Sequence, residues 1–275
     1  MSDQTSLSSD SALEISPLEF RFSLKEKTTL KKSFSLKNSG SEPLTIKLYA
    51  RPAPGLDNAA YGRLAEWLSF SEPTITLAAG EVKTVPFSIT VPESPPPGGQ
   101  YAFLYAEILS TPASAAPSGN AFSLTSRAAI RLYGISEASA VRSVSVSSPH
   151  ATTFSFSPNL TADATVKNSG NIDFTAQSAF SVSTLFGKTL YSDSASTVLL
   201  PDAEKSLLSV WEEAPALGVY RLSYSLKALD TEVSLNRLVL ISSPIFTVLL
   251  VFFFLLALFF GLNFPKRPTK SKKSH

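Results

Sequence analysis

Apolar and polar residues alternate along several stretches of the chain. The alternation is clear at residues 44–48 and 85–91, and it returns at 160–166 and 220–228. Side chains of a β-strand point to opposite faces in turn, so a period of two predicts strands with one face on a core and one in water. We therefore expect an all-β fold in both halves of the chain.

One stretch breaks this pattern. Pro244 to Phe264 is almost wholly apolar, and no Lys, Arg, Asp or Glu occurs from Leu238 to Pro265. A helix needs about 20 apolar residues to cross a hydrocarbon core of about 30 Å. A chain in lipid must bond its backbone groups internally, so the sequence predicts a transmembrane helix at 241–264. A buried core helix is the alternative, but core helices are seldom apolar on every side.

Basic residues follow the apolar stretch. The segment 265–275 contains Lys266, Arg267, Lys270, Lys272 and Lys273. Short basic flanks stay on the cytoplasmic side, so we expect a basic cytoplasmic tail and the domains before it outside the cell. The chain has a formal net charge of +2, so the part before the tail is net negative. Nucleic acid is therefore not an expected partner.

The first residues are polar and slightly acidic. Residues 1–11 have neither the basic nor the apolar region of a signal peptide, and we expect them to be a disordered lead. An outside domain normally needs such a signal. Either the natural start lies upstream, or the domains lie in the cytosol and the protein is tail-anchored; the basic tail favours the outside arrangement.

Three short motifs occur twice, in the same order. The first motif ends in the turn Asn-Ser-Gly, which runs from Asn38 to Gly40 and again from Asn168 to Gly170. The second is a turn that ends in Glu and Lys, and the third is a Pro–x–Gly segment before a strand that begins with Tyr. The copies span 34–40, 77–83 and 95–101 in the first half, and 164–170, 199–205 and 214–220 in the second. This order predicts a duplicated β-domain.

Each copy has about seven short strands in roughly 100–125 residues, which is typical of an immunoglobulin-like sandwich. We predict the first sandwich at 12–137 and the second at 138–240. Within them we expect Trp67 and Trp211 to be large core or interface anchors.

Three further local features are predicted in the first half. Residues 58–68 are expected to form a short helix. Pro86 lies inside an alternating stretch, so its strand should be an edge strand or bulged there. Residues 110–120 are small and Pro-rich, and we interpret them as a long loop between paired strands, with an interdomain linker as the alternative.

Composition excludes several kinds of site. Cysteine is absent, and histidine occurs only at His150 and His275. A single loop histidine without nearby ligands is a poor metal site, and the common nucleophile-elbow and phosphate-loop motifs are missing. Glu212 and Glu213 are adjacent, so in a strand they point to opposite faces and cannot form a catalytic pair. We expect no catalytic, metal or cofactor site and no enzymatic activity.

Two groups of residues are candidate ligand contacts. Lys25, Lys27, Lys31 and Lys32 place four cations within eight residues, and these could bind an anionic polymer or lipid headgroups, or form a solvated turn. Tyr101, Phe103 and Tyr105 share one face of a predicted strand. That face could be an aromatic platform for a sugar, or part of the sheet core.

Several segments resemble one family of bacterial surface proteins. They are 13–24, 37–44, Trp67 with 73–108, 166–174, Phe186-Gly187, Leu200-Pro201 and 218–220. Over roughly residues 13–273 the chain is similar to the WxL-interacting proteins, which usually begin with a signal peptide. The resemblance implies two immunoglobulin-like domains and one membrane helix. It also implies that the first domain binds peptidoglycan and the second binds a host or surface protein.

The sequence thus predicts a non-enzymatic, single-pass protein of the bacterial cell membrane. Its domains would bind cell-wall polymer such as peptidoglycan, or other surface proteins, for example in adhesion. One route is strand addition, in which an exposed sheet edge accepts a strand of the partner. One alternative is a tail-anchored cytosolic adaptor, because residues 15–22 faintly resemble the major sperm protein fold. A cell-wall hydrolase is the other alternative.

Overall fold

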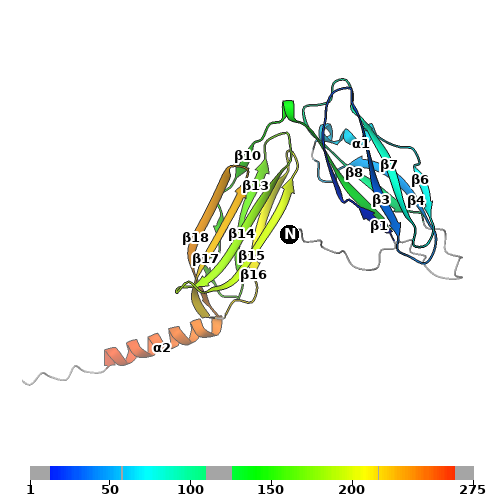
Figure 1. The fold of residues 1–275 in the computed structure, drawn as a ribbon. Helices are drawn as coiled ribbons and strands as arrows, with labels where there is room; N and C mark the ends of the chain where they lie inside the picture. The colour runs from blue at the N-terminus through cyan, green and yellow to red at the C-terminus, as the bar shows by residue number, and fades with distance from the viewer. Residues whose placement is uncertain (1–12, 57, 110–125, 216, 264–275) are drawn as a thin grey trace, which may run out of the picture. The chain divides into compact units, whose positions relative to one another are not determined.

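The computed structural model describes residues 13–56, 58–109, 126–215 and 217–263, with side chains as far as Phe260. Strands β1 to β9 form a first sandwich and β10 to β18 a second, and the helix α2 follows them (Figure 1). The predicted all-β fold of two immunoglobulin-like sandwiches is confirmed.

Contacts divide the chain into two compact units. Unit 1 comprises residues 1–145, 167–175 and 198–204, and unit 2 comprises 146–166, 176–197 and 205–275. The predicted lead, the 110–120 loop and the basic tail lie outside the described residues. The predicted domain limits are not tested by this division and stay predictions.

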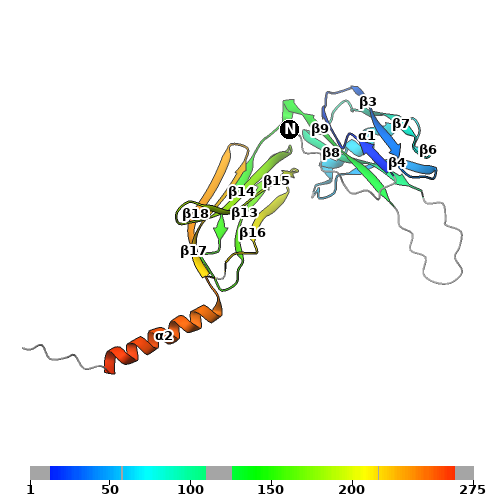
Figure 2. The same ribbon diagram turned by 60° about the horizontal axis from the view of Figure 1, so that its bottom comes forward.

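The first sandwich has a four-stranded and a five-stranded sheet. The first sheet has the order β1 (Leu13–Ser16), β3 (Thr29–Asn38), β7 (Val82–Thr90) and β5 (Leu68–Phe70). The second has the order β2 (Glu19–Ser23), β9 (Arg127–Ser136), β8 (Gly98–Ile108), β4 (Leu44–Pro52) and β6 (Thr74–Leu77). Figure 2 shows the long hairpin strands β8 and β9 side by side. After a cis Ser16–Pro17 bond the chain passes from the first sheet to the second, where β2 runs parallel to β9.

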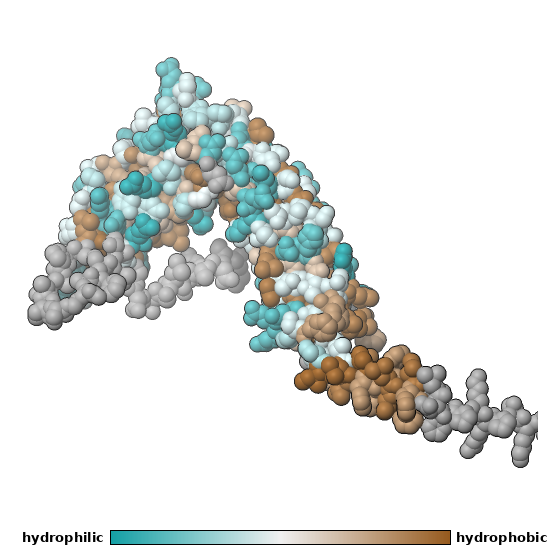
Figure 3. All heavy atoms as spheres, turned by 180° about the vertical axis from the view of Figure 1, so that it is seen from behind, coloured by the Kyte–Doolittle hydropathy of each residue, from teal (hydrophilic) through white to brown (hydrophobic). Residues whose placement is uncertain are grey.

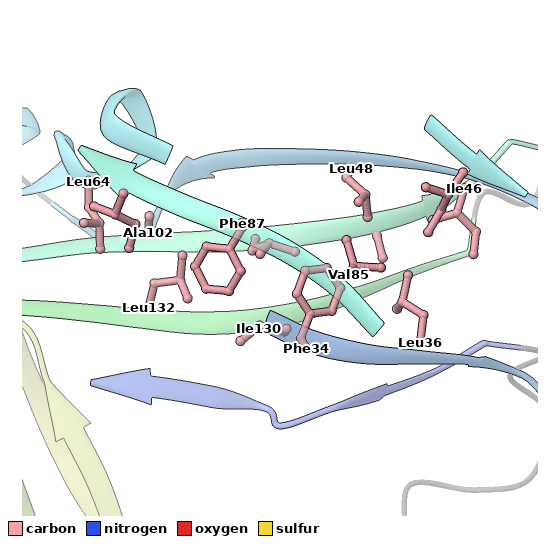
Figure 4. Packing of buried hydrophobic residues seen from close by; sticks show 14 of the residues in the cluster. Phe34, Leu36, Ile46, Leu48, Leu64, Val85, Phe87, Ala102, Ile130 and Leu132 are labelled. Carbon is pink, nitrogen blue, oxygen red and sulfur yellow. The ribbon is translucent and has the colours of Figure 1, made fainter. Parts of the chain in front are cut away.

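The core of the first sandwich lies between these sheets (Figure 4). Phe34, Leu36, Val85 and Phe87 come from the four-stranded sheet, and they face residues such as Ile46, Leu48, Leu104, Ile130 and Leu132 from the five-stranded sheet. All of these side chains are almost fully buried. The alternating residues at 44–48 and 85–91 therefore point inward as predicted, and the polar residues between them face outward.

A short helical segment joins β4 to β5. It consists of the 3₁₀-helix η1 (Ala59–Gly62) and the single-turn α1 (Leu64–Trp67). The Asn58 side chain accepts a hydrogen bond from the Ala60 N–H, which satisfies a free donor at the helix start. Leu64 is fully buried and Trp67 packs partly buried against the core, so the helix predicted at 58–68 is confirmed.

Pro86 occupies a partly open position in β7. It lies opposite Ser33 of β3, while β5 pairs with β7 only from Phe87 to Ile89. Among the described strands, the β5 side of β7 is therefore open at Pro86, and a missing N–H breaks no ladder there. The prediction of an edge strand is wrong, because β7 lies between β3 and β5; Pro86 fits there because β5 ends before it.

The second sandwich repeats this two-sheet plan. In one sheet β13 (Leu160–Asn168) pairs with β10 (Val144–Val146), β11 (His150–Ala151) and β16 (Glu204–Trp211). The other has the order β12 (Phe154–Ser155), β18 (Thr231–Ser242), β17 (Leu217–Ala228), β14 (Phe174–Thr184) and β15 (Thr189–Leu199). The short helix η2 (Glu137–Ser139) precedes β10.

Aromatic rings pack around Trp211 in the second sandwich. The indole is buried, and its ring centroid lies 5.8 Å from that of Tyr191 and 6.0 Å from that of Tyr220. The Tyr191 ring is stacked and the Tyr220 ring is edge-on, and both arrangements are favourable for aromatic pairs. The prediction that Trp211 anchors a core is confirmed.

The chain continues from β18 into α2 (Pro244–Asn263). Apart from Thr247, its described side chains are apolar, and most of them are solvent-exposed. Within the described part of the chain, no helix is long and apolar enough to cross a membrane. The transmembrane helix predicted at 241–264 is therefore not supported by the structure.

A buried asparagine closes the same turn in each sandwich. The Asn38 Nδ2 group donates to the carbonyl oxygens of Glu42 (2.8 Å), Leu77 (3.3 Å) and Ala78 (3.0 Å). Its Oδ1 accepts a hydrogen bond of 2.9 Å from the Gly40 N–H. Since Asn38 ends β3 while the accepting carbonyls flank β4 and end β6, this side chain ties the two sheets together.

Asn168 makes the equivalent contacts. Its Nδ2 group donates to the carbonyls of Ile172 (2.8 Å) and Leu199 (3.1 Å), and its Oδ1 accepts from the Gly170 N–H at 2.9 Å. Both asparagines are fully buried. The predicted turns at Asn38–Gly40 and Asn168–Gly170 are thus structural elements that couple the sheets of a sandwich.

The third motif also has one structure in both copies. A Gly stands two residues before a Tyr on the same face of the strand, and the Tyr ring folds back over it. A Cβ atom added to Gly99 would lie 1.9 Å from the Tyr101 hydroxyl, and one added to Gly218 would lie 2.4 Å from the Tyr220 hydroxyl. The glycine is needed for this close approach, and the shared geometry supports the predicted duplication.

Removing a turn asparagine should weaken the fold. Asn38→Ala leaves buried carbonyl groups without a donor, and we expect a loss of about 2 kcal/mol in the free energy of unfolding. Asn168→Ala should behave alike. Urea denaturation measures the loss, and Ser39→Ala, an exposed neighbour, is the control. Equal midpoints for Asn38→Ala and Ser39→Ala would contradict the coupling role.

Adding a methyl group at Gly218 should force the Tyr220 ring to move. For Gly218→Ala we expect a destabilisation of about 1–3 kcal/mol, the usual cost of overpacking. In the double variant Gly218→Ala/Tyr220→Ala the ring is gone, so the two costs should not add. Additive losses in the denaturation midpoints would show that the Gly218 effect does not come from the Tyr220 ring.

Candidate functional site

A patch of aromatic and charged side chains covers the outward face of the five-stranded sheet in the first sandwich. The strand register places Lys47 opposite Glu107, Tyr49 opposite Tyr105, and Arg51 opposite Phe103, while Arg127 of β9 lies beyond Glu107. Residues directly opposite in a sheet project to the same side. We call this set the cation–aromatic face: Lys47, Tyr49, Arg51, Phe103, Tyr105, Glu107 and Arg127.

The rings of this face are in contact with one another. The Tyr49 and Tyr105 centroids lie 5.3 Å apart with an interplanar angle of 26°, and the Phe103 centroid lies 6.0 Å from that of Tyr105. All three rings are half-buried. They therefore present a continuous, partly exposed aromatic surface across β4 and β8.

Arginine side chains lie over two of these rings. The Arg127 guanidinium carbon is 4.9 Å from the Tyr105 centroid, and that of Arg51 is 5.9 Å from the Tyr49 centroid. Cation–π contacts at such distances are favourable, and they keep each guanidinium close to a ring. The two guanidinium groups thereby lie beside the aromatic surface, and Arg127 also has a hydrogen bond with Tyr49.

The face is hollowed. A cavity of about 380 Å³ is lined by Lys47, Tyr49, Ala50, Arg51, Tyr105, Glu107 and Arg127. These residues carry three cations and one carboxylate, so the hollow has a net positive charge. A ligand with negative groups beside a ring or a sugar face would match it.

The electrostatic surroundings of Tyr49 are changed by its neighbours. Burial raises the pKa of the Tyr49 hydroxyl, the hydrogen bond to the Glu107 carboxylate raises it further, and Arg127 opposes the rise. The neutral phenol is therefore the form present at neutral pH, and its single O–H is directed to the Glu107 carboxylate.

Tyr101 does not belong to the exposed patch. Its ring is buried, and its hydroxyl donates to Asp173 Oδ1 at 3.2 Å and accepts from the Asp173 N–H at 2.7 Å, within unit 1. Burial, with the nearby Asp173 charge, raises the pKa of Tyr101. Arg21 pairs with the same carboxylate at 2.8 Å and lies over the Tyr133 ring. Of the predicted platform, Tyr105 is accessible and Tyr101 is a packing residue.

The four candidate lysines occupy the β2–β3 turn and the start of β3. Lys27 has a positive φ of 52° and forms an exposed ion pair with Glu93. Lys31 and Lys32 are consecutive in β3, so they point to opposite faces of the sheet. The structure thus does not bring all four lysines together on one face, and their role as ligand contacts stays a prediction.

The remaining predicted groups lie elsewhere. His150 is exposed in β11, opposite Asp163. In the residues that the structure describes, no group of three His, Cys, Asp or Glu side chains is arranged to hold a metal ion. The five basic residues expected to orient the chain in a membrane lie outside the described residues.

Sequence reasoning missed Lys47, Tyr49, Arg51 and Arg127. In the sequence, Arg127 is far from the other three, and the register of β4, β8 and β9 is what unites them. The available signal was the period of two at 45–51, whose outward positions are Thr, Lys, Tyr and Arg.

The chain matches no model of a known protein family, and no curated protein matches it. Among solved structures it is similar to the YadV chaperone, with 13% identity and a TM-score of 0.44 over 83% of this chain and 100% of that one. It is also similar to the complex of Salmonella enterica SafA pilin with the SafB chaperone (11% identity, TM-score 0.43, coverage 86% and 99%). A third similar structure is the E. coli chaperone DraB (11% identity, TM-score 0.41, coverage 82% and 96%). Likeness at this level carries no argument about the function of this chain, and the resemblance to WxL-interacting proteins stays a prediction.

The Glu107 carboxylate should be detectable in the titration of Tyr49. A negative neighbour disfavours the phenolate, so Glu107→Gln should lower the pKa of Tyr49 toward the ordinary tyrosine value. Selective ¹³C labelling of tyrosine Cζ and an NMR titration measure the shift. Glu42→Gln, another acid of the first sandwich, should leave the Tyr49 titration unchanged; an equal effect of both variants would contradict the contact.

Proposed function

We propose that the protein is a non-enzymatic binding protein, anchored in a bilayer through α2, that holds a surface polymer or surface protein on the cation–aromatic face. The observation that carries this proposal is the geometry of that face. Stacked rings and guanidinium groups offer binding contacts over a broad hollow on a rigid sheet.

The chemistry of the face indicates the chemistry of the ligand. The Tyr49, Tyr105 and Phe103 rings offer flat apolar surface, which suits the face of a sugar or another ring. Lys47, Arg51 and Arg127 suit carboxylate or phosphate groups beside it, because guanidinium binds such groups through paired hydrogen bonds. Peptidoglycan and other anionic wall polymers combine both features, and so does a protein surface with acidic and aromatic residues.

The exposed side chains of α2 support anchoring. From Ile245 to Phe260 most of its Phe, Leu and Val side chains are exposed. A contiguous apolar surface of this kind marks a site of contact with a membrane or another protein. We propose that this segment and the basic residues after it form a single-pass anchor. The sandwiches then lie outside the cell and the C-terminus lies in the cytoplasm.

Binding to isolated cell wall tests the first part of the proposal. Arg127→Ala and Tyr105→Ala should each weaken retention of the detergent-solubilised full chain about tenfold, equivalent to about 1.4 kcal/mol. Arg63→Ala is the matched control, because Arg63 is an exposed arginine of the same sandwich that pairs with Glu66. Equal retention of Arg127→Ala and Arg63→Ala, or no retention of the unmodified chain, would reject the face as the binding site.

Protease accessibility in intact cells tests the topology. With an export signal supplied upstream, the sandwiches should be digested without lysis. Protection until lysis would place them in the cytosol and favour the adaptor alternative.

A further inference from the structure

The outward face of the five-stranded sheet in unit 2 changes from polar to apolar toward α2. At one end the register pairs Lys227 with Glu232 and Ser225 with Ser234, followed by Ser223 with Asn236, whose side chains hydrogen-bond at 2.5 Å. Toward the helix the outward positions become leucine, valine and phenylalanine. We call this part the apolar end; its members are Leu217, Val219, Leu238, Leu240, Phe154 and Phe156.

The members of the apolar end lie next to one another. Val219 of β17 is opposite Leu240 of β18, and Leu240 is in turn opposite Phe154 of β12. The Phe154 and Phe156 ring centroids are 4.7 Å apart in an edge-on arrangement. The six side chains are between 42% and 58% exposed. Figure 3 shows apolar surface on the part of unit 2 from which α2 leaves.

A single residue, Ser243, separates β18 from α2. The Thr247 N–H donates to the Ser243 carbonyl at 3.0 Å, and the Ser242 and Thr247 hydroxyls are 2.9 Å apart. These bonds tie the first helical turn to the end of the strand. A strand advances about 3.4 Å per residue, so Leu240 lies within roughly 14 Å of Pro244 along the chain.

We propose that the apolar end is a membrane-contacting surface, on which unit 2 rests in the interfacial region of the bilayer that holds α2. This inference rests on the anchoring part of the proposed function. The headgroup region and the outer acyl chains take up apolar protein surface to a depth of about 5–10 Å. Because the link to α2 is so short, the rows of Leu240 and Val219 must lie close to this region once α2 is inserted.

The boundary of the apolar end fits the same arrangement. Arg221 is exposed and stands opposite Leu238, in the last row before the serine and asparagine residues. A long basic side chain at such a boundary keeps its stem on apolar surface and its charge at the level of lipid phosphates. The apolar rows begin where α2 begins, and this position favours lipid as the partner. A surface that binds a second protein would have no reason to begin at the helix.

Site-specific fluorescence in vesicles tests this inference, and the absence of cysteine in the chain allows single labels. The full chain is reconstituted into vesicles of equal parts phosphatidylcholine and phosphatidylglycerol, with an environment-sensitive dye on Leu240→Cys, Ser234→Cys or Phe253→Cys. Lipids brominated near the headgroup should quench the Leu240 dye, and lipids brominated deeper should quench the Phe253 dye. Ser234, on the same face of β18 but among the polar rows, should show no loss of fluorescence.

The outcomes separate the two proposals. Quenching at Phe253 with none at Leu240 would overturn the membrane-contacting surface and leave the anchor intact. No quenching at Phe253 would reject the anchor, and with it the inference that depends on it.

A further variant separates contact from mere tethering. Val219→Asn/Leu238→Asn, with the dye on Leu240→Cys, should lose headgroup-level quenching while the Phe253 dye keeps its own. If quenching at Leu240 persists in this variant, the tether alone explains it and the apolar end has no role. A blue shift of the Leu240 dye that appears without quenching and depends on protein concentration would identify a second copy as the partner instead.

Discussion

The two buried asparagine turns are the constraint on which both sandwiches depend. Each asparagine stands at the end of a strand in one sheet and donates to carbonyl groups at the ends of strands in the other sheet or directly beside them. Hydrophobic packing holds two sheets together without fixing how far one slides along the other, because it has no direction. Buried hydrogen bonds are directional and costly to lose, so Asn38 and Asn168 fix this alignment. The cation–aromatic face lies on one of the two sheets that Asn38 ties together, and the register of β4, β8 and β9 within that sheet arranges its side chains.

Much of the fold was predictable from local pattern. The period of two located the strands, Asn38 and Asn168 located the turns, and three motifs repeated in the same order predicted the duplication. These signals are local because strand geometry, side-chain hydrogen bonds within a turn and crowded backbone positions restrict the residue types that fit. Tyr101 shows where that reasoning ends: it shares a strand face with Tyr105, yet one ring is buried against Asp173 and the other is accessible.

The candidate site was less predictable for the same reason. A face formed by β4, β8 and β9 depends on which residues are opposite one another, and the period of two leaves that register undetermined. Lys25, Lys27, Lys31 and Lys32 attracted notice as neighbours in sequence, whereas Arg51 and Arg127 became neighbours only through Phe103, Tyr105 and Glu107. Clustering along the chain and clustering on the surface are therefore separate properties in a β-protein.

The one-residue link between β18 and α2 also has a mechanical consequence. If α2 is held in place and the sandwich is pulled away, the force enters the protein through the end of β18. That strand lies between β12 and β17, and its register with β17 runs without interruption from Thr231 to Ser242. A pull along β18 would stretch all the backbone hydrogen bonds between β17 and β18 at the same time. These bonds would have to break together, because they could not open one after another. The strand that continues into α2 is thus well placed to resist tension.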